Sequence, residues 1–341
     1  MDKPVDSSEP TARPVLSLVI PCYNEARGLA ILHARVAAAL TDDIGTTEIL
    51  FVNDGSTDET RAMLSALAKA DPRVGRIDLS RNFGKEAALS AGIDHARGDA
   101  VIFLDADLQD PPECIGPMVR AWREGYDVVA MKRACRAGDS MLRRSLARVF
   151  YRLLSSLSDV AIPDDVGDFR LLSRRAIEAV KAMPERNRYT KGLFAWIGYR
   201  TIELEYKRPA RLVGSSKWPL LKLLGLALDG ITSFSIAPLR LASIAGILTA
   251  LFAVAYGAFI LLRTLFVGDS VAGFPTLFVM ISFIGGVQLM AIGLLGEYVG
   301  RLLLESKQRP IYFVDSTHLP ILQETEAPPR PELQSKRVVG A

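Results

Sequence analysis

Val101-Ile102-Phe103-Leu104-Asp105-Ala106-Asp107 is the stretch that decides the fold. Its four apolar residues end abruptly in two carboxylates, a pattern typical of a buried strand whose carboxyl end reaches a crevice. Two carboxylates one residue apart repel each other unless a cation lies between them, and oxygen ligands favour Mg²⁺ or Mn²⁺. The stretch therefore indicates a site for a metal ion and a diphosphate, although a plain polar turn would give the same tripeptide.

Two further apolar runs end in the same way. Residues 16–20 run into Pro21-Cys22-Tyr23-Asn24-Glu25, and residues 48–52 run into Asn53-Asp54-Gly55-Ser56. Helix start signals follow the three runs: a capping Asn24, the capping-box spacing of Ser56 to Glu59, and Asp110 before Pro111. Because strands that alternate with helices are parallel, the three polar tips should share one edge of an α/β sheet, where such sheets bind ligands.

Three motifs resemble those of family 2 glycosyltransferases: Ile20-Pro21-Cys22-Tyr23-Asn24-Glu25, Val52 to Asp58, and Leu104-Asp105-Ala106-Asp107-Leu108-Gln109-Asp110-Pro111. The resemblance is strongest to the membrane polyprenyl-phosphate glycosyltransferases, which include dolichol-phosphate mannose synthase, the undecaprenyl-phosphate aminoarabinose transferase and the bactoprenol glucosyltransferases. It covers residues 15–312. It implies a GT-A catalytic domain, Rossmann-like with a mostly parallel sheet, and inverting transfer of a sugar from a nucleotide donor to a lipid phosphate.

The composition agrees with a membrane enzyme. The 341 residues leave room for one α/β domain and an appendage, and 49% of them are hydrophobic. The mean hydropathy of +0.20 is high for a soluble enzyme. A net charge of +3 suggests no nucleic-acid partner. The three cysteines have no metal-binding spacing and are odd in number, which is typical of a reducing compartment.

The chain divides into five predicted segments. Residues 1–14 form a polar, disordered tail without a signal-peptide core, and residues 15–213 form the catalytic domain. Residues 214–235 mix lysines with leucines and read as an amphipathic segment lying on a bilayer, with a buried core helix as the alternative. Residues 236–304 form a two-helix transmembrane hairpin, and residues 305–341 form a cytosolic tail that is disordered after Asp315.

Charges around the hairpin predict its orientation. The two spans are Leu241 to Leu262 and Val271 to Gly296, and a short loop joins them. Basic residues precede the first span and follow the second: Lys217, Lys222, Arg240, Arg301, Lys307 and Arg309. The positive-inside rule therefore places both termini and the catalytic domain of this multi-pass protein in the cytosol. The resemblance implies that the membrane is the bacterial inner membrane. Glu297 and Arg301, one helical turn apart, should form an ion pair.

The resemblance assigns the donor site residue by residue. It makes Asp107 and Gln109 the metal ligands, with Asp105 as a further ligand or beside one. The positions that match the donor-binding ones are Pro21, Tyr23, Glu25, Val52, Asp54, Lys85 and Ala106. Tyr23 could stack on the base or bound it. Asp54 could accept a hydrogen bond from an imide N–H, act as a helix-capping turn residue, or do both. Lys85 ends Arg81-Asn82-Phe83-Gly84-Lys85, which resembles the family's loop beside the donor.

The acceptor phosphate needs cations rather than a base, because it is already anionic at neutral pH. Candidates are Lys132, Arg133, Arg211 and Lys217. The last three match basic residues that contact phosphates in dolichol-phosphate mannose synthases, although residues beside the membrane could serve only the anionic headgroups. Asp168, in a Gly-Asp-Phe-Arg stretch that resembles bactoprenol glucosyltransferases, joins Asp105 and Asp107 as a catalytic candidate and could orient a cation or touch the sugar.

Together these features predict a membrane glycosyltransferase that moves glucose from UDP-glucose to undecaprenyl phosphate for cell-envelope glycan (lipopolysaccharide) modification, with Mg²⁺ or Mn²⁺. The resemblance also suggests a homo-oligomer, a tetramer. UDP-GlcNAc, UDP-galactose, UDP-aminoarabinose or GDP-mannose are alternative donors, because single changes near the sugar can switch them. A non-catalytic nucleotide-binding membrane scaffold is a further alternative. A processive polysaccharide synthase is disfavoured because no tryptophan lies in a Gln-x-x-Arg-Trp context, and two spans alone offer a flippase no path.

Overall fold

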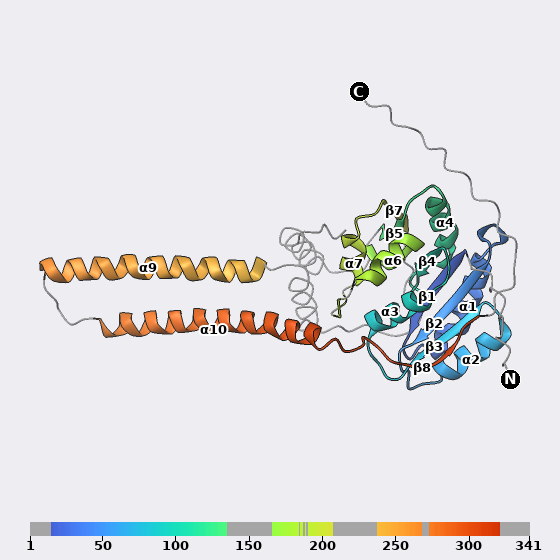
Figure 1. Cartoon of the computed structure of the whole chain (residues 1–341), viewed down its shortest axis with the longest axis horizontal. Coiled ribbons are helices and arrows are strands. Elements are labelled where there is room, and N and C mark those ends of the chain that lie inside the picture. The colour runs from blue at the N-terminus through green and yellow to red at the C-terminus, as the bar shows by residue number, and fades with distance from the viewer. Residues whose placement is uncertain are drawn as a thin grey trace, which may run out of the picture.

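The computed structural model describes residues 15–134, 166–183, 185–186, 188, 190–206, 237–267 and 273–320 (Figure 1). Several predictions fall on other residues and lie outside this described part: the tail 1–14, the amphipathic segment 214–235, Arg211, Lys217, and the loop between the two C-terminal helices. The described chain forms a sheet domain from which two long helices extend (Figure 1).

A single eight-stranded sheet, in the order β7-β5-β6-β4-β1-β2-β3-β8, organises the domain. Its strands are β1 (Leu16–Cys22), β2 (Thr47–Asn53), β3 (Val74–Leu79), β4 (Ala100–Phe103), β5 (Val128–Arg133), β6 (Val166–Ser173), β7 (Thr201–Tyr206) and β8 (Val314–His318). Strands β4, β1, β2 and β3 are parallel neighbours, as are β5 and β7. Only β6 and β8 run antiparallel to their neighbours. This mostly parallel α/β sheet agrees with the GT-A expectation.

Helices cover both faces of the sheet. Helices α1 (Ala26–Ala39), α2 (Thr60–Ala70) and α4 (Ile115–Arg123) pack on one face, and α3 (Lys85–His95), α6 (Arg174–Ala182) and α7 (Thr190–Trp196) on the other. The buried strand β4 shows the alternation that this requires. Ile102 faces the first helical layer, and Val101 and Phe103 face the second. Short 3₁₀ turns at Asp42–Ile44 (η1) and Pro112–Cys114 (η2) complete the domain.

The helix starts differ from the sequence prediction. Helix α2 begins at Thr60 rather than directly after Ser56, and a 3₁₀ turn precedes α4. Asn24, the expected cap of α1, instead accepts a hydrogen bond from the Thr57 N–H (2.9 Å). Ser56 in return accepts one from the Asn24 N–H (3.0 Å). The side chains of Asn24 and Ser56 therefore tie the two loops to each other instead of capping helices.

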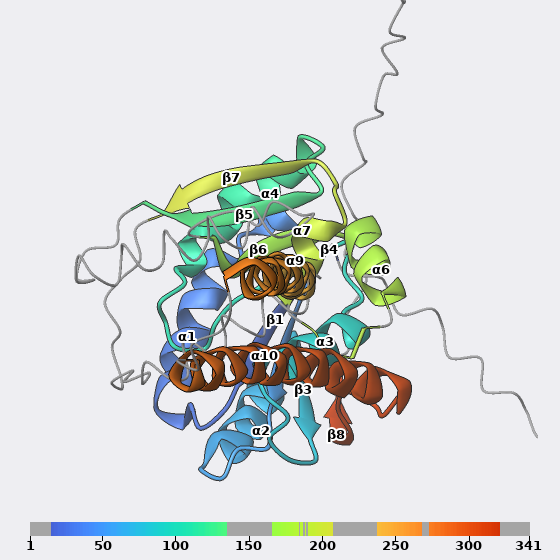
Figure 2. The ribbon, with the colours of Figure 1, turned by 90° about the vertical axis from the view of Figure 1, so that its left-hand side faces the viewer.

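Two long helices, α9 (Ala237–Val267) and α10 (Phe274–Ser306), lie side by side and extend away from the sheet (Figures 1 and 2). Many of their large apolar side chains are exposed, among them Leu251, Phe266, Leu289 and Met290. Within the described residues, one stretch, Phe283–Ser306, is long and apolar enough to cross a membrane, and Ala242–Tyr256 is a shorter apolar stretch. The expected ion pair is confirmed, since Arg301 and Glu297 are 2.9 Å apart.

Strand β8 corrects the expectation that the chain is disordered after Asp315. Residues 314–318 pair antiparallel with β3, where Arg76 lies opposite His318. Without β8, the N–H and C=O groups of β3 would form an open sheet edge. Because backbone pairing at an edge needs no buried side-chain face, a polar segment can satisfy those groups.

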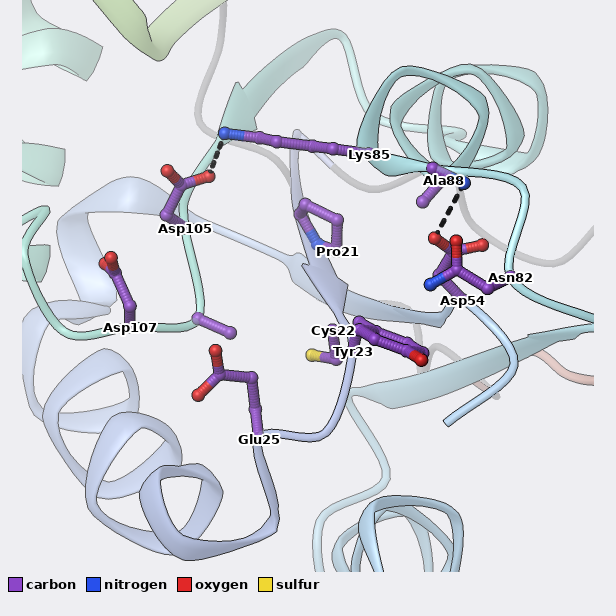
Figure 3. Close-up of a pocket in the computed structure, with 12 residues that line it drawn as sticks. Pro21, Cys22, Tyr23, Glu25, Asp54, Asn82, Lys85, Ala88, Asp105 and Asp107 are labelled. Carbon is purple, nitrogen blue, oxygen red and sulfur yellow. Dashed lines mark hydrogen bonds and ion pairs between the residues drawn. The ribbon is translucent and has the colours of Figure 1, made fainter. Parts of the chain in front are cut away.

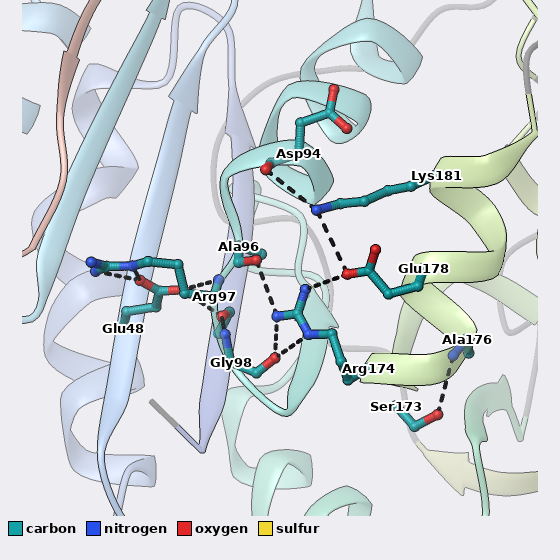
Figure 4. Close-up of polar contacts among 11 residues, drawn as sticks. Glu48, Asp94, Ala96, Arg97, Gly98, Ser173, Arg174, Ala176, Glu178 and Lys181 are labelled. Carbon is teal, nitrogen blue, oxygen red and sulfur yellow. Dashed lines mark hydrogen bonds and ion pairs between the residues drawn. The ribbon is translucent and has the colours of Figure 1, made fainter. Parts of the chain in front are cut away.

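Glu48, a buried residue of β2, is the centre of a polar network (Figure 4). Its carboxylate accepts hydrogen bonds from the Ser17 hydroxyl (2.6 Å), the Arg97 N–H (2.7 Å) and the Arg97 guanidinium (2.8 and 3.0 Å). The Arg97 N–H belongs to the turn that leads into β4. Glu48 therefore fixes that turn against the buried centre of the sheet.

We expect Glu48→Ala to lower the free energy of unfolding by about 3 kcal/mol, near the low end for breaking a buried ion pair. The reason is that Ser17 and the Arg97 N–H lose their acceptor, while the Arg97 side chain, 31% exposed, regains part of its hydration. Thermal unfolding of the full chain in detergent measures the change. Glu178→Ala is the matched control, because its pair with Arg174 is exposed and worth only a few tenths of a kcal/mol. Equal effects of the two substitutions would contradict the prediction.

Candidate active site

A pocket of about 290 Å³ opens at the carboxyl ends of the parallel strands (Figure 3). Its walls come from the segments that follow β1, β2 and β4 and from the start of α3. The lining residues are Pro21, Cys22, Tyr23, Glu25, Asp54, Asn82, Gly84, Lys85, Ala88, Asp105, Ala106 and Asp107. The three polar strand tips thus meet at one edge of the sheet, where open α/β sheets bind ligands.

Asp105 and Asp107 are presented to the pocket by a tight turn. Leu108 adopts φ +63°, a left-handed conformation that costs a β-carbon residue about 1–2 kcal/mol. Its side chain is buried in the core and holds this turn in place. Within the turn, the Gln109 N–H donates to the Asp107 carboxylate (3.1 Å) and the Asp105 N–H donates to Asp110 (3.2 Å). Both carboxylates are therefore held on a preformed backbone.

Lys85 reaches from the first turn of α3 to the same edge (Figure 3). Its ammonium lies 2.5 Å from the Asp105 carboxylate and 2.7 Å from that of Asp168, which comes from β6. Burial of the ammonium lowers its pKa, but the charges of Asp105 and Asp168 outweigh burial and raise the pKa of Lys85 above its ordinary value. Lys85 therefore stays charged at neutral pH and brings Asp168, which is not part of the pocket lining, to the carboxylate turn.

Asp110 lies beneath the carboxylate turn and is almost fully buried. Burial, together with the charges of Asp105 and Asp107, raises the pKa of Asp110 to about 7. The Tyr206 hydroxyl, at the end of β7, donates to its carboxylate (3.2 Å). Burial lowers the pKa of Arg133, but its hydrogen bond to Tyr206 and the charges of Asp110 and Asp105 raise it overall. Negative charge is thus concentrated at this turn, which favours a bound cation.

The residues at the turn fit a divalent cation that a substrate helps to hold. Among the described residues, no three His, Cys, Asp or Glu side chains are grouped to hold a metal by themselves. Asp105 and Asp107 nevertheless face one pocket and offer hard oxygen ligands. Mg²⁺ is usually bound by one or two carboxylates plus substrate phosphates, and this pair meets that requirement. Gln109 contributes its N–H to Asp107 and does not line the pocket.

Asp54 fastens the loop before α3 to the tip of β2. Its two carboxylate oxygens accept hydrogen bonds from the N–H groups of Phe83 (2.7 Å) and Gly84 (2.9 Å). Next to it, Gly55 adopts φ +62°, and a β-carbon there would lie 2.3 Å from the Arg81 carbonyl carbon. Asp54 therefore has a structural role, but it ties a loop rather than capping a helix, since neither α2 nor α3 has a side-chain cap at its N-cap residue. Contact of Asp54 with a base stays a prediction.

The other predicted residues are distributed unevenly. Pro21, Tyr23, Glu25 and Ala106 line the pocket, and Tyr23 as a whole residue is 46% exposed. Val52 is fully buried in β2 and does not line it. Lys132 lies on β5 and pairs with Glu203 of β7 at 2.7 Å. Arg133, the next residue of β5, is another acceptor candidate within the described part of the chain. The charges of Asp110 and Asp105 help to raise its pKa.

Sequence reasoning did not single out four lining residues, Cys22, Asn82, Gly84 and Ala88. Asn82 and Gly84 belong to the motif that ends at Lys85, so the loop was identified but not these positions in it. Ala88 lies three residues after Lys85 on α3. That spacing places both on one helix face and would have indicated Ala88.

Comparison with known proteins identifies the family. Residues 17–181 match the family model "Glycosyl transferase family 2". A prophage bactoprenol glucosyl transferase homolog of Escherichia coli strain K12 is 46% identical over 88% of this chain and 98% of its own length. The bactoprenol glucosyl transferase of Shigella phage SfV is 46% identical over 88% of this chain and 97% of its own.

Solved structures add only a remote likeness. Glucosyl-3-phosphoglycerate synthase from Mycobacterium tuberculosis is 19% identical, with a TM-score of 0.45 over 64% of this chain and 76% of that one. The assignment rests on the close relatives and the family model: the chain belongs to glycosyl transferase family 2 and is a glycosyltransferase with a GT-A-like α/β fold.

Proposed function

We propose that this glycosyltransferase moves a hexose, glucose from UDP-glucose, onto undecaprenyl or another polyprenyl phosphate with inversion at the anomeric carbon. The observation that carries the proposal is the pocket in which Asp105 and Asp107 face the same space as Tyr23 and Asp54. Carboxylates there suit a metal-bound diphosphate, and the half-exposed Tyr23 ring offers a face for a nucleobase. The names of the relatives supply the acceptor, a bactoprenyl chain, and the sugar.

The chemistry needs no base from the protein. An oxygen of the lipid phosphate attacks the anomeric carbon, the bond from that carbon to the donor's diphosphate oxygen breaks, and UDP leaves with the electron pair. A bound Mg²⁺ or Mn²⁺ at Asp105, Asp107 and Gln109 would neutralise the departing diphosphate. Lys85 keeps the carboxylate turn and Asp168 together, and the nucleoside is held by Pro21, Tyr23, Glu25, Asp54 and Ala106.

The acceptor phosphate is proposed to meet Arg133, Arg211 and Lys217. Arg133 lies near the acidic turn, and a β-carbon on Gly167, next to Asp168, would lie 3.5 Å from an Arg133 guanidinium nitrogen. Arg211 follows the end of β7 by only a few residues. Lys132 is a weaker candidate because it is already paired with Glu203.

We infer the membrane arrangement from the exposed apolar side chains of α9 and α10. We infer that α9 and α10 both span the bacterial inner membrane, with the sheet domain and both termini in the cytosol. Segment 214–235 would lie on the bilayer, and the protein would form a homo-oligomer. Support comes from the apolar surface of both helices and from the bactoprenyl substrate of the named relatives.

The decisive experiment offers the purified full-length protein undecaprenyl phosphate with one donor at a time: UDP-glucose, UDP-GlcNAc, UDP-galactose, UDP-aminoarabinose or GDP-mannose. Mass spectrometry of the lipid then reads the product. We expect a hexose adduct with UDP-glucose and none with undecaprenol, which lacks the phosphate. Transfer from another donor would replace glucose in the proposal, and no adduct with any donor would overturn undecaprenyl phosphate as the acceptor.

The orientation of the helices is tested separately. We expect an engineered cysteine near Gly268, between α9 and α10, to react with a membrane-impermeant thiol reagent in intact cells, because the positive-inside rule places that loop outside. A cysteine at Thr57, on the sheet domain, should react only after the cells are opened. Labelling of the Thr57 position in intact cells would contradict a cytosolic catalytic domain.

A further inference from the structure

The segment that follows α10 returns to the sheet domain and runs along its edge (Figures 1 and 2). We call residues 312–320 the C-terminal strap. It includes β8, which pairs with β3, and it is fastened at several points. Tyr312 donates to Asp94 of α3 (2.6 Å), Arg61 of α2 pairs with Asp315 (2.7 Å), and the Arg97 guanidinium donates to the Pro320 carbonyl (2.9 Å).

One set of strap contacts reaches the loop that forms a wall of the donor pocket. The Ser80 N–H donates to the Phe313 carbonyl (2.9 Å), and the Phe313 ring lies 6.3 Å from the Phe83 ring, centroid to centroid. Phe83 is also covered by the Arg81 guanidinium at 4.1 Å. The Phe83 N–H in turn donates to Asp54, which lines the pocket. Phe313 therefore contacts the loop that carries Asn82 and Gly84 without lining the pocket itself.

A second set of contacts reaches the turn after β2. The Ser316 hydroxyl donates to the buried Asp78 carboxylate (2.8 Å). Asp78 accepts a hydrogen bond from the Asn53 amide (2.7 Å), and Asn53 accepts one from the Ser56 N–H (3.1 Å). This chain of hydrogen bonds ends at the turn that contains Asp54. The strap thus contacts the loop before α3 through Phe313, and it is linked through Ser316 and Asp78 to the turn that contains Asp54.

We propose that the C-terminal strap positions the nucleotide side of the donor pocket, so that donor affinity depends on a segment that follows the apolar helix α10 in the sequence. Phe313 and Ser316 are positioning residues, since neither lines the pocket. None of the contacts of Phe313 and Ser316 described above is with the carboxylate turn after β4. Loss of the strap contacts should therefore weaken nucleotide binding more than catalysis. The identity of the nucleotide rests on the proposed function, whereas the mechanical role of the strap does not.

The test uses full-length protein in detergent, with UDP as the probe in calorimetry. We expect Phe313→Ala to raise the Kd for UDP and the KM for the UDP-sugar by about three- to tenfold, the range of one aromatic pair. Ser316→Ala should have a similar effect through Asp78. For both variants, kcat and the KM for polyprenyl phosphate should change less than about twofold, because the interaction acts on donor binding alone. Phe313→Tyr should retain wild-type values, since it keeps the ring contact.

Thr317→Ala is the matched control. Thr317 lies in the same strand opposite Ile77, is exposed, and makes none of the side-chain contacts described above. It should leave the Kd for UDP unchanged. Equal weakening by Thr317→Ala would mean that β8 matters only as a strand, and unchanged UDP binding in both Phe313→Ala and Ser316→Ala would overturn the proposal.

Hydrogen exchange provides a readout that needs no ligand. In Phe313→Ala, the amides of Phe83 and Gly84 should exchange faster than in wild type, because the loop that holds them against Asp54 opens more often. Unchanged exchange at these two amides would overturn the proposed positioning role of the strap, even if sugar transfer is confirmed. If instead wild type neither binds UDP nor transfers sugar, the proposed function fails, and exchange at residues 80–84 still decides the role of the strap.

Discussion

Asp107→Asn should lower sugar transfer on the order of a hundredfold or more, while the protein stays folded and membrane-bound. The substitution removes one of the two charges that would hold a divalent cation against the leaving diphosphate, and that electrostatic stabilisation is the main contribution the site can make. Its amide can still accept the Gln109 N–H, so the turn itself should survive. Turnover of UDP-sugar with polyprenyl phosphate at saturating Mg²⁺ or Mn²⁺ measures the effect.

Asp42→Asn is the matched control for this substitution. Asp42 lies in the exposed 3₁₀ turn η1 and is not among the residues that line the pocket, so the same acid-to-amide change should leave turnover unaltered. Near-normal turnover of Asp107→Asn would refute the assignment of Asp107. Full wild-type activity in excess chelator would refute the metal requirement itself.

Lys85→Met should lower kcat/KM about ten- to a hundredfold, the worth of one charge-assisted contact. Among the described residues that line the pocket, Lys85 is the one cationic side chain. Its loss leaves the carboxylates of Asp105 and Asp168 facing each other without the ammonium between them. The carboxylate turn should then lose its geometry as well as its charge balance, so both kcat and the donor KM should suffer.

Two further variants define the cause of that loss. Lys85→Arg should recover part of the activity, because the charge is kept while the planar guanidinium replaces a compact ammonium. Lys69→Met, at the exposed end of α2, should behave as wild type. An inactive Lys85→Arg together with a fully active Lys85→Met would show that positive charge at this position is not what the site needs.

The strand tips were predictable because they combine two strong signals. Buried parallel strands such as Ala100–Phe103 must be apolar on both faces, and the residues directly after them reach the ligand-binding edge. Sequence alone therefore placed Tyr23, Asp54, Asp105 and Asp107 at one edge, where they line one pocket. The role of Lys85 beside the donor came only from the resemblance. Its contact with Asp168 joins residues far apart in the sequence, and local sequence patterns do not predict such contacts.

The errors have a common physical origin. Side chains of Asn24 and Ser56 have the types and spacing of helix caps, but tertiary contacts between the two loops satisfy other backbone groups with them. Strand β8 was missed because its sequence, Val-Asp-Ser-Thr-His, has no buried face and hence no apolar alternation. Both outcomes depend on which segments meet in space, and local patterns do not contain that information.

The two edges of the sheet are shielded by different means, and this bears on self-association. Among the described strands β7 is one edge, and its Glu203 and Glu205 place carboxylates there, which disfavours pairing with a second chain. On the other side, β3 carries the apolar Ile77 and Leu79 and depends on β8 for cover. A chain cut before Tyr312 would offer β3 as a template for strand addition. Such truncated forms should therefore aggregate through their sheets, whereas in the uncut chain β8 keeps the β3 edge from pairing with another copy.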